Sequence, residues 1–294
     1  MAAQLRRGHL LALVTVLFWG TTFISTKILL LEFAPIEILF CRFLLGLMAL
    51  MLVMPKKLGW CGWRREARCM LAGLSGITLY YLLENVALTK TSTANTGIIV
   101  STAPFFTAMA AAFITREEQL RRNFFVGFLF AMAGVWVISF YGGDTGGPAG
   151  LSGDLLALGA AVVWAVYSIL SREIGAWGYH PILTTRRIFV YGLLFLLPVL
   201  LLTRAQVGFE RFGRGENLFN LVYLGLGASA TCFVTWNKAI SILGSVRTSS
   251  YIYAVPVINI LGAALVLGES ITAPILLGTA LTILGLIISE LKEK

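Results

Sequence analysis

The chain has 294 residues, of which 58% are hydrophobic and 13% charged, with a mean hydropathy of +0.85 and a formal net charge of +9. This composition excludes an ordinary soluble domain, in which roughly half of the residues are apolar. The positive charge does not indicate nucleic-acid binding, because the basic residues sort according to the side of a membrane on which their loops would fall. The sequence therefore predicts an integral membrane protein.

Ten apolar runs are each close to the roughly 20 residues that a helix needs to cross a bilayer. The expected spans are residues 10–31, 36–54, 69–88, 92–113, 123–141, 153–174, 182–203, 217–240, 247–268 and 272–290. The first run follows two arginines, as in a signal peptide. It is too long and lacks a small-residue cleavage site, so we expect it to remain as a span.

Basic residues indicate the topology. Fourteen lie in segments on the N-terminal side of the predicted membrane and four in the loops of the other side, which predicts that both termini are cytoplasmic. Charged residues near span ends, such as Lys27 and Lys238, are expected to extend to water. We expect a multi-pass protein of the plasma membrane or of a bacterial inner membrane.

The second half of the chain repeats the first, so we expect two domains, residues 1–141 and 153–294, joined by an external glycine-rich linker at 142–152. Trp19 matches Trp164 at an offset of 145, while Asn85 matches Asn237, Pro104 matches Pro256 and Glu117 matches Glu269 at an offset of 152. Each half carries five spans. Because five is odd, the second copy would enter the membrane from the opposite side, giving an inverted-topology repeat.

Pro104 and Pro256 lie within apolar runs, where a proline kinks the helix and frees a carbonyl that only a neighbour or cavity water can satisfy. We therefore expect helix kinks at gates beside a cavity. Glu117 and Glu269 directly precede the next span. A carboxylate there interacts favourably with the unpaired backbone N–H groups at the start of that helix, so we expect a structural role for both residues. Proton transfer is the alternative. The repeated glycines Gly127, Gly134, Gly278 and Gly285 predict close helix packing.

Several motifs together resemble the drug/metabolite transporter superfamily, EamA branch. They are "LFWGTTFISTK" in span one, "ALTKTSTANTGIIVSTAPFFTAMAAAFITREE" across spans three and four, and "WNKAISILGSVRTSSYIYAVPVINILGAALVLGES" in the second half. The resemblance implies a ten-helix permease with a cavity formed by spans one, three, four, six, eight and nine, which moves small metabolites and often exports amino acids. In span six, Trp164 is followed by "AVYS" and not by glycine, so we expect the two copies of the first helix to differ in role.

Polar and aromatic residues near mid-span are the candidates for a substrate-binding cavity. They are Trp19, Thr22, Tyr81, Glu84, Asn85, Ser101, Trp164, Tyr167, Trp236, Asn237, Tyr251, Tyr253 and Asn259. The alternative is that the aromatic residues fill the bundle core and the small polar ones join helices. Glu84 could bind an amino group of the substrate, carry a coupled proton, or be an interfacial carboxylate. Arg42 is a candidate for binding an anion, although we favour a structural role.

The leading hypothesis is a secondary transporter that moves a small metabolite, an amino acid or a related compound, by alternating access around a midplane cavity. We expect export, a lipid environment, no cofactor, no metal and no nucleic-acid partner, with a proton as a candidate coupled ion. One chain supplies a complete cavity, so we expect a monomer. The alternatives are an intramembrane enzyme acting on a lipid-linked substrate and a membrane scaffold. Against an enzyme, the spans lack paired histidines and clustered acids.

Overall fold

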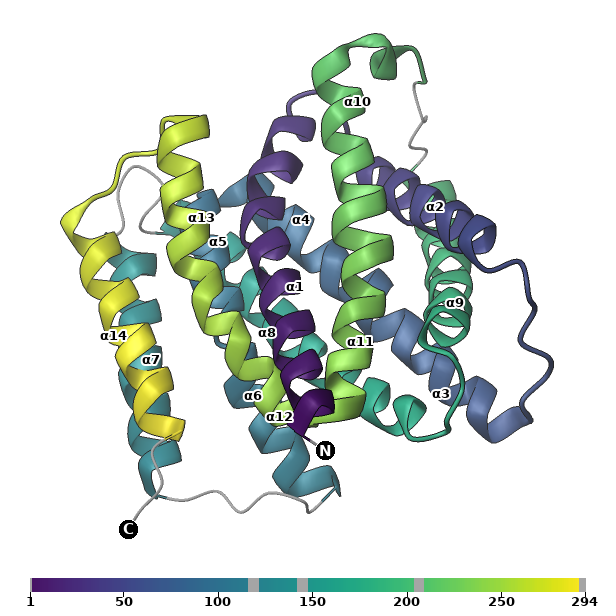
Figure 1. The fold of residues 1–294 in the computed structure, drawn as a ribbon. Coiled ribbons are helices and arrows are strands. Elements are labelled where there is room, and N and C mark those ends of the chain that lie inside the picture. Colours follow the sequence, from purple (N-terminus) through teal and green to yellow (C-terminus); the bar gives the residue numbers. More distant parts are fainter. Residues whose placement is uncertain (1, 116–121, 142–147, 204–208, 291–294) are drawn as a thin grey trace.

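The computed structural model describes residues 2–115, 122–141, 148–203 and 209–290, and every regular element in these ranges is a helix (Figure 1). Nine helical runs in the described ranges are long and apolar enough to cross a membrane, and a tenth apolar helix, Ala273–Ser289, is shorter. The chain is thus an all-helical membrane protein, as the hydropathy of its sequence predicts.

The first half of the chain contains two spans that are built from several helical segments. Its elements are α1 (Ala2–Leu29), α2 (Pro35–Val53), α3 (Trp63–Gly73), the π-helix η1 (Leu74–Leu79), α4 (Tyr80–Lys90), α5 (Thr93–Val100), α6 (Ala103–Ala110), the π-helix η2 (Ala111–Thr115) and α7 (Arg122–Tyr141). Elements α3, η1 and α4 form one span, and α5, α6 and η2 form the next.

The second half repeats this plan, including its interrupted spans. Its elements are α8 (Pro148–Gly175), α9 (Pro181–Leu202), the 3-10 helix η3 (Phe209–Gly213), α10 (Gly215–Val222), the π-helix η4 (Tyr223–Thr231), α11 (Cys232–Leu243), α12 (Ser245–Ser249), the 3-10 helix η5 (Ser250–Ala254), α13 (Val255–Gly262), the π-helix η6 (Ala263–Leu267) and α14 (Ala273–Glu290).

Helices α1, α3 and α8 start well before the apolar runs that predicted them. Helix α3, for example, starts at Trp63, whereas the expected span starts at residue 69, and Arg64 and Arg65 lie in its first turn. Charged side chains mark where a helix leaves the hydrocarbon layer, but the backbone hydrogen bonds of the helix continue past that point. Hydropathy therefore underestimates the length of the helix.

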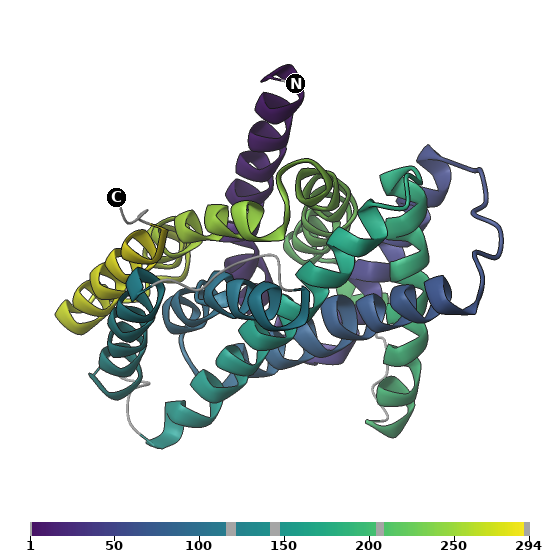
Figure 2. The same ribbon diagram turned by 90° about the horizontal axis from the view of Figure 1, so that it is seen from below.

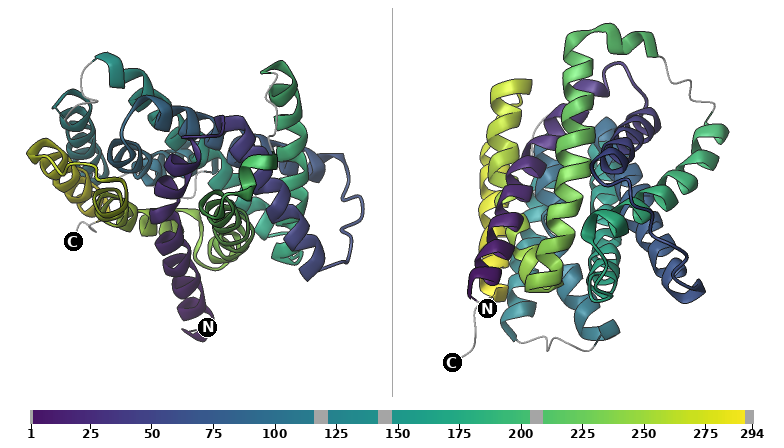
Figure 3. Two further views of the ribbon diagram at one scale, coloured as in Figure 1. Left: turned by 90° about the horizontal axis from the view of Figure 1, so that it is seen from above. Right: turned by 45° about the vertical axis from the view of Figure 1, so that its right-hand side comes forward.

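The two halves of the chain interleave. Helix α1 packs against α11 and α8 packs against α4, while α2 meets α9, α5 meets α13 and α7 meets α14. Each of these contacts joins an element of the first half to one of the second. Figures 2 and 3 show α7 and α14 side by side at one edge of the bundle, with α2, α3 and α9 at the other. The core is therefore shared between the halves.

Glycines join α7 to α14, as the repeated glycine positions predict. A Cβ atom on Gly127 would lie 2.3 Å from the carbonyl oxygen of Gly285, and one on Gly134 would lie 2.5 Å from that of Gly278. Backbones this close leave no room for a side chain. The prediction of close packing at these glycines is confirmed.

Each end of the bundle has a buried carboxylate. The start of α1 and the end of α14 lie at the lower end in Figure 1, which we call the terminal face, and the upper end is the opposite face. At the terminal face, Glu66 accepts hydrogen bonds from Arg187 at 2.5 Å and from the Tyr191 hydroxyl at 2.6 Å. At the opposite face, Glu37 accepts one from Arg211 at 3.0 Å. A buried carboxylate thus binds an arginine of the other half at each end.

Candidate functional site

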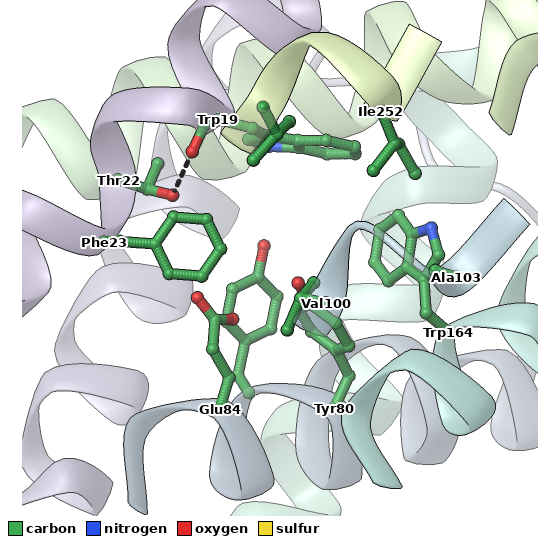
Figure 4. A pocket seen from close by; sticks show the side chains of 11 residues that line it. Trp19, Thr22, Phe23, Tyr80, Glu84, Val100, Ala103, Trp164 and Ile252 are labelled. Atoms are coloured by element: carbon green, nitrogen blue, oxygen red, sulfur yellow. Dashed lines mark hydrogen bonds between the residues drawn. The ribbon is translucent and has the colours of Figure 1, made fainter. Parts of the chain in front are cut away.

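A cavity with a volume of about 30 Å³ lies between the two halves near the middle of the bundle. Its walls come from α1, α4, α8, the junction of α5 with α6, and the junction of η5 with α13. We call this space the central cavity. Figure 4 shows its lining side chains, which are Trp19, Thr22, Phe23, Tyr80, Tyr81, Glu84, Val100, Ala103, Trp164, Ile252 and Val255.

The two prolines of the repeat explain part of this cavity. Helix α5 ends at Val100 and α6 starts at Ala103, immediately before Pro104, while α13 starts at Val255, immediately before Pro256. A proline has no N–H to donate to the carbonyl four residues earlier, so a helix is easily interrupted at this point. The residues beside each interruption face the central cavity. The helices are interrupted beside both prolines, and the expectation that these positions are kinks at gates stays a prediction.

Glu84 is the single charged residue among those that line the central cavity. It is 2% exposed, and its Oε2 atom has no hydrogen-bond partner among the described residues. The Tyr80 hydroxyl lies within hydrogen-bond reach of the carboxylate. Figure 4 shows the carboxylate pointing between Phe23 and Tyr80 toward the open space. Burying a carboxylate oxygen that accepts no hydrogen bond costs free energy unless a cation or a hydrogen-bond donor binds to it.

Arg42 supplies positive charge behind the cavity wall. It is fully buried, and its guanidinium carbon lies 4.5 Å from the ring centre of Tyr81, a cavity residue. Its Nε atom donates to the Ser229 hydroxyl at 3.0 Å, and its two terminal nitrogens have no hydrogen-bond partner among the described residues. Arg42 and Glu84 interact electrostatically. Arg42 therefore offsets the charge of Glu84 without itself lining the cavity.

Aromatic rings form most of the remaining wall. The ring centre of Trp164 lies 5.2 Å from that of Trp19 and 4.7 Å from that of Tyr80, at edge-to-face and tilted angles. The indole of Trp19 donates to the carbonyl of Ala228 at 3.1 Å, which fixes its orientation. Such rings attract cations to their faces and pack against apolar groups. The lining thus combines aromatic rings with the single carboxylate of Glu84.

The structure brings part of the predicted set together and places the rest elsewhere. Trp19, Thr22, Tyr81, Glu84 and Trp164 line the cavity, and their expected role in binding a substrate stays a prediction. Other predicted residues lie behind the wall. Trp236 is buried behind Trp19 with the ring centres 4.8 Å apart, Ser101 donates to the carbonyl of Ile98, and Asn85 donates to that of Pro35 at 3.3 Å. Tyr167 and Asn237 bond to each other at 2.7 Å.

The predicted residues of span nine lie apart from the cavity. The Tyr251 hydroxyl bonds to His9 at 2.7 Å, Tyr253 packs against the cluster that contains Phe105, and Asn259 donates to the carbonyl of Thr93 at 2.7 Å. None of the three is among the residues that line the central cavity, so their positions do not support the expected role in binding a substrate. Packing against neighbouring helices accounts for each of them, which is the alternative that the sequence left open.

Glu269 contacts a different helix from the one expected. Its carboxylate accepts hydrogen bonds from the backbone N–H groups of Thr93 and Ala94, at 3.0 and 3.1 Å, at the start of α5. The physical reason is the expected one, a carboxylate at a helix N-terminus, but the helix belongs to the other half and is not the next one in the chain. Glu117 lies outside the described residues.

Several lining residues were not predicted from the sequence. They are Phe23, Tyr80, Val100, Ala103, Ile252 and Val255. One signal could have found the last four, because Val100 matches Ile252 and Ala103 matches Val255 at the repeat offset of 152. The first pair lies four residues before the repeated prolines, and the second pair directly before them. Among the described residues, no three His, Cys, Asp or Glu side chains gather as they would around a metal ion.

Known proteins resemble the chain over almost its whole length. The EamA-like transporter family model matches residues 6–140 and again residues 151–291. An uncharacterised transporter of Archaeoglobus fulgidus is 28% identical over 98% of each chain. A probable amino-acid metabolite efflux pump of Salmonella typhimurium is 26% identical over 97% of this chain and 95% of its own. A probable terminal-alkyne amino-acid exporter of Streptantibioticus cattleyicolor is 28% identical over 74% of this chain and 71% of its own.

A solved crystal structure shares the fold, with a TM-score of 0.71 at 21% sequence identity over 96% of this chain and 95% of its own. The two family matches coincide with the two halves that interleave in the structure. Members of this family are membrane transporters and not enzymes. With both of its halves matched, the chain belongs to the EamA-like transporter family.

Proposed function

We propose that the chain is a secondary transporter that exports a small amphipathic metabolite carrying an amino group, an amino acid or a close relative, by alternating access around the central cavity. The observation that carries this proposal is Glu84, a buried carboxylate with a free oxygen among aromatic, aliphatic and hydroxyl-bearing side chains. The names of the Salmonella and Streptantibioticus relatives, both of which refer to amino acids, support the same substrate class and the outward direction.

The chemistry of the cavity favours an amino group in particular. An ammonium ion donates charge-assisted hydrogen bonds to a carboxylate, and the faces of Tyr80, Trp19 and Trp164 add cation–π attraction. The same rings receive the apolar remainder of the molecule. When the cavity is empty, Arg42 offsets the charge of Glu84. A bound ammonium group would therefore donate to the Glu84 oxygen that has no hydrogen-bond partner among the described residues.

Alternating access would follow from the repeat. We propose that the halves are inverted copies that exchange conformations, with both termini cytoplasmic in a plasma or bacterial inner membrane, and that one chain works as a monomer. The interleaved contacts, in which each span packs against one of the other half, support a cavity controlled by both halves. A rearrangement at either end would then expose the same Glu84 to one side or the other.

Three related probes test the substrate class: phenylalanine, phenethylamine, which lacks the carboxylate, and 3-phenylpropionate, which lacks the amino group. We expect the two amines to raise the melting temperature of the purified protein and 3-phenylpropionate not to. Glu84→Gln should weaken amine binding about tenfold or more, because hydrogen bonds to charged groups contribute about 1.5–3 kcal/mol. Glu216→Gln, an exposed carboxylate at the start of α10, is the matched control and should bind as the wild type does.

Uptake of any stabilising amine into proteoliposomes, with and without a pH gradient, then tests transport. If uptake by the wild type depends on the pH gradient and uptake by Glu84→Gln does not, the same carboxylate carries a coupled proton. Equal stabilisation by 3-phenylpropionate, or unchanged flux in Glu84→Gln, would contradict an amino-group site at Glu84. Saturation of the flux with substrate distinguishes a transporter from a channel.

A further inference from the structure

A second pocket lies at the terminal face, where α8 and α11 end and α9 begins. It has a volume of about 120 Å³, and its polar lining residues are Ser171, Tyr179, Thr184, Asn237, Lys238 and Ser241. We call it the terminal vestibule. Its wall is nearly half polar and carries a lysine, whereas the central cavity is mainly aromatic and carries a glutamate. A polar space of this size accommodates water, so the vestibule suits the aqueous end of a pathway.

Tyr167 lies between the two spaces. The side chain is fully buried, and its ring centre lies 4.8 Å from that of Trp164, which lines the central cavity. At the other end, its hydroxyl donates to the side-chain oxygen of Asn237, which lines the vestibule, at 2.7 Å. A single side chain thus touches one wall residue of each space.

Gly76 provides the room that the Tyr167 ring occupies. A Cβ atom on Gly76 would lie 2.2 Å from the Cδ2 atom of Tyr167, well inside van der Waals contact. Gly76 belongs to the π-helix η1, which leads directly into the part of α4 that holds Tyr80 and Glu84. The ring therefore rests directly on the backbone of the span that carries the proposed binding site.

The repeat partner of Tyr167 shows that this arrangement is specific to the second half. At the offset of 145 the corresponding residue is Thr22, which lines the central cavity and whose hydroxyl donates to the carbonyl of Trp19 at 2.7 Å. The short threonine leaves space where the tyrosine would fill it. The barrier is therefore built into one half of the chain.

We propose that Tyr167 closes the central cavity off from the terminal vestibule and that the vestibule is the aqueous end of the translocation path on this face. This inference rests on the proposed transport function. Rotation of the Tyr167 side chain away from Asn237 joins the two spaces, at the cost of one buried hydrogen bond and the ring contact with Trp164. The hydroxyl holds the closed position, and the ring forms the barrier.

The test measures how fast a membrane-impermeant methanethiosulfonate reagent modifies single cysteines from the terminal face. The background carries Cys41→Ala, Cys61→Ser, Cys69→Ala and Cys232→Ala. Ala103→Cys reports on the central cavity and Thr184→Cys on the vestibule. Gly59→Cys, at an exposed loop position between α2 and α3, identifies sealed vesicles with the terminal face outward.

We expect Thr184→Cys to react readily and Ala103→Cys to react slowly. Adding Tyr167→Phe, which keeps the ring and loses the hydroxyl, should speed the reaction of Ala103→Cys about fivefold, as expected for one buried hydrogen bond. Adding Tyr167→Ala should speed it roughly a hundredfold, because the ring is also lost. Gly76→Ala, whose methyl group displaces the ring from the other side, should also speed it.

Phe43→Ala is the matched control, because Phe43 is an equally buried ring in the same core that lines neither space. An equal acceleration in Phe43→Ala, or no acceleration in both Tyr167→Phe and Tyr167→Ala, would overturn the barrier role. An unreactive Thr184→Cys would overturn the vestibule. The readout needs no substrate and no flux, so its failure is distinct from failure of the transport proposal. Tyr167→Phe preserves the packing and remains informative if the alanine variants fail to fold.

Discussion

The ends of α1 and α4 at the opposite face and the ends of α8 and α11 at the terminal face occupy equivalent positions in the repeat, yet one end is joined and the other holds a pocket. In the first half, Lys27 donates to the carbonyl of Leu88 at 2.6 Å, which joins α1 to α4. In the second half, the space beside Lys238 and Asn237 forms the terminal vestibule. The two copies of the repeat thus differ at equivalent ends, with a lysine hydrogen bond in one and a pocket in the other.

The asparagines of the repeat show the same difference at a single position. Asn85 donates to the carbonyl of Pro35 and so joins α4 to the start of α2. Its partner Asn237 instead donates to the hydroxyl of Thr185 at 3.1 Å and accepts from Tyr167. A residue that joins two helix ends in one half thus positions the proposed barrier in the other.

The largest effect should come from Glu66→Leu, which removes the buried carboxylate that joins α3 to α9 beside the vestibule. Arg187 and Tyr191 would lose their partner, and breaking a buried ion pair costs about 3–5 kcal/mol. We expect a marked fall in the melting temperature in detergent. Glu173→Leu, an exposed partner of Arg68 on the same face, is the control, and an equal fall in both variants would show that burial at Glu66 is unimportant.

A smaller effect is expected from Lys27→Met, which keeps the length of the side chain and removes the charged donor that closes the first half. Loss of its hydrogen bonds to Leu88 and Thr91 should cost about 1.5–3 kcal/mol. The measurement is modification of Ala103→Cys from the opposite face, which should accelerate about tenfold or more. Lys90→Met, an exposed lysine at the end of α4, should leave the rate unchanged. If modification accelerates only from the terminal face, the comparison between the two ends is wrong.

The smallest effect separates the two asparagines. Asn85→Ala loses one long hydrogen bond, so its free energy of unfolding should fall by about 1 kcal/mol. Asn237→Ala loses two bonds, at 2.7 and 3.1 Å, and should cost about 2 kcal/mol. Unfolding in denaturant measures both values in the same background. Equal losses would indicate that the two halves use this position in the same way.

Apolar runs and repeated prolines were sufficient to predict the helical spans and the interruptions beside Val100 and Val255, because hydrophobic length and a missing N–H act locally. The sequence also made Glu84 a candidate, since a carboxylate inside a span is rare, and its role stays a prediction. Rotation of a helix about its axis was harder to predict. Tyr80 and Tyr81 both face the cavity although neighbouring residues on a helix point about 100° apart, and they directly follow the π-helix η1.

Contacts between distant segments could not be read from the sequence. Tyr251 was expected in the cavity because it is aromatic and near mid-span, but its distance from the cavity depends on how α12 and η5 approach α1. Glu269 was correctly expected to meet helix amides, and its partner α5 is revealed only by the interleaving of the halves. The sequence therefore predicted which kind of group Glu269 would bind, but not which helix would supply that group.

The glycine contact between α7 and α14 has a consequence for biosynthesis. Helix α7 completes the first half, but its glycine face has no partner until α14, the last helix of the chain, has been made. Assembly of this edge must therefore wait until translation is nearly complete, and a chain cut short before Ala273 would present the grooves at Gly127 and Gly134 to lipid. A quality-control system that recognises unpaired helix surfaces in the membrane would thus detect an incomplete chain at α7.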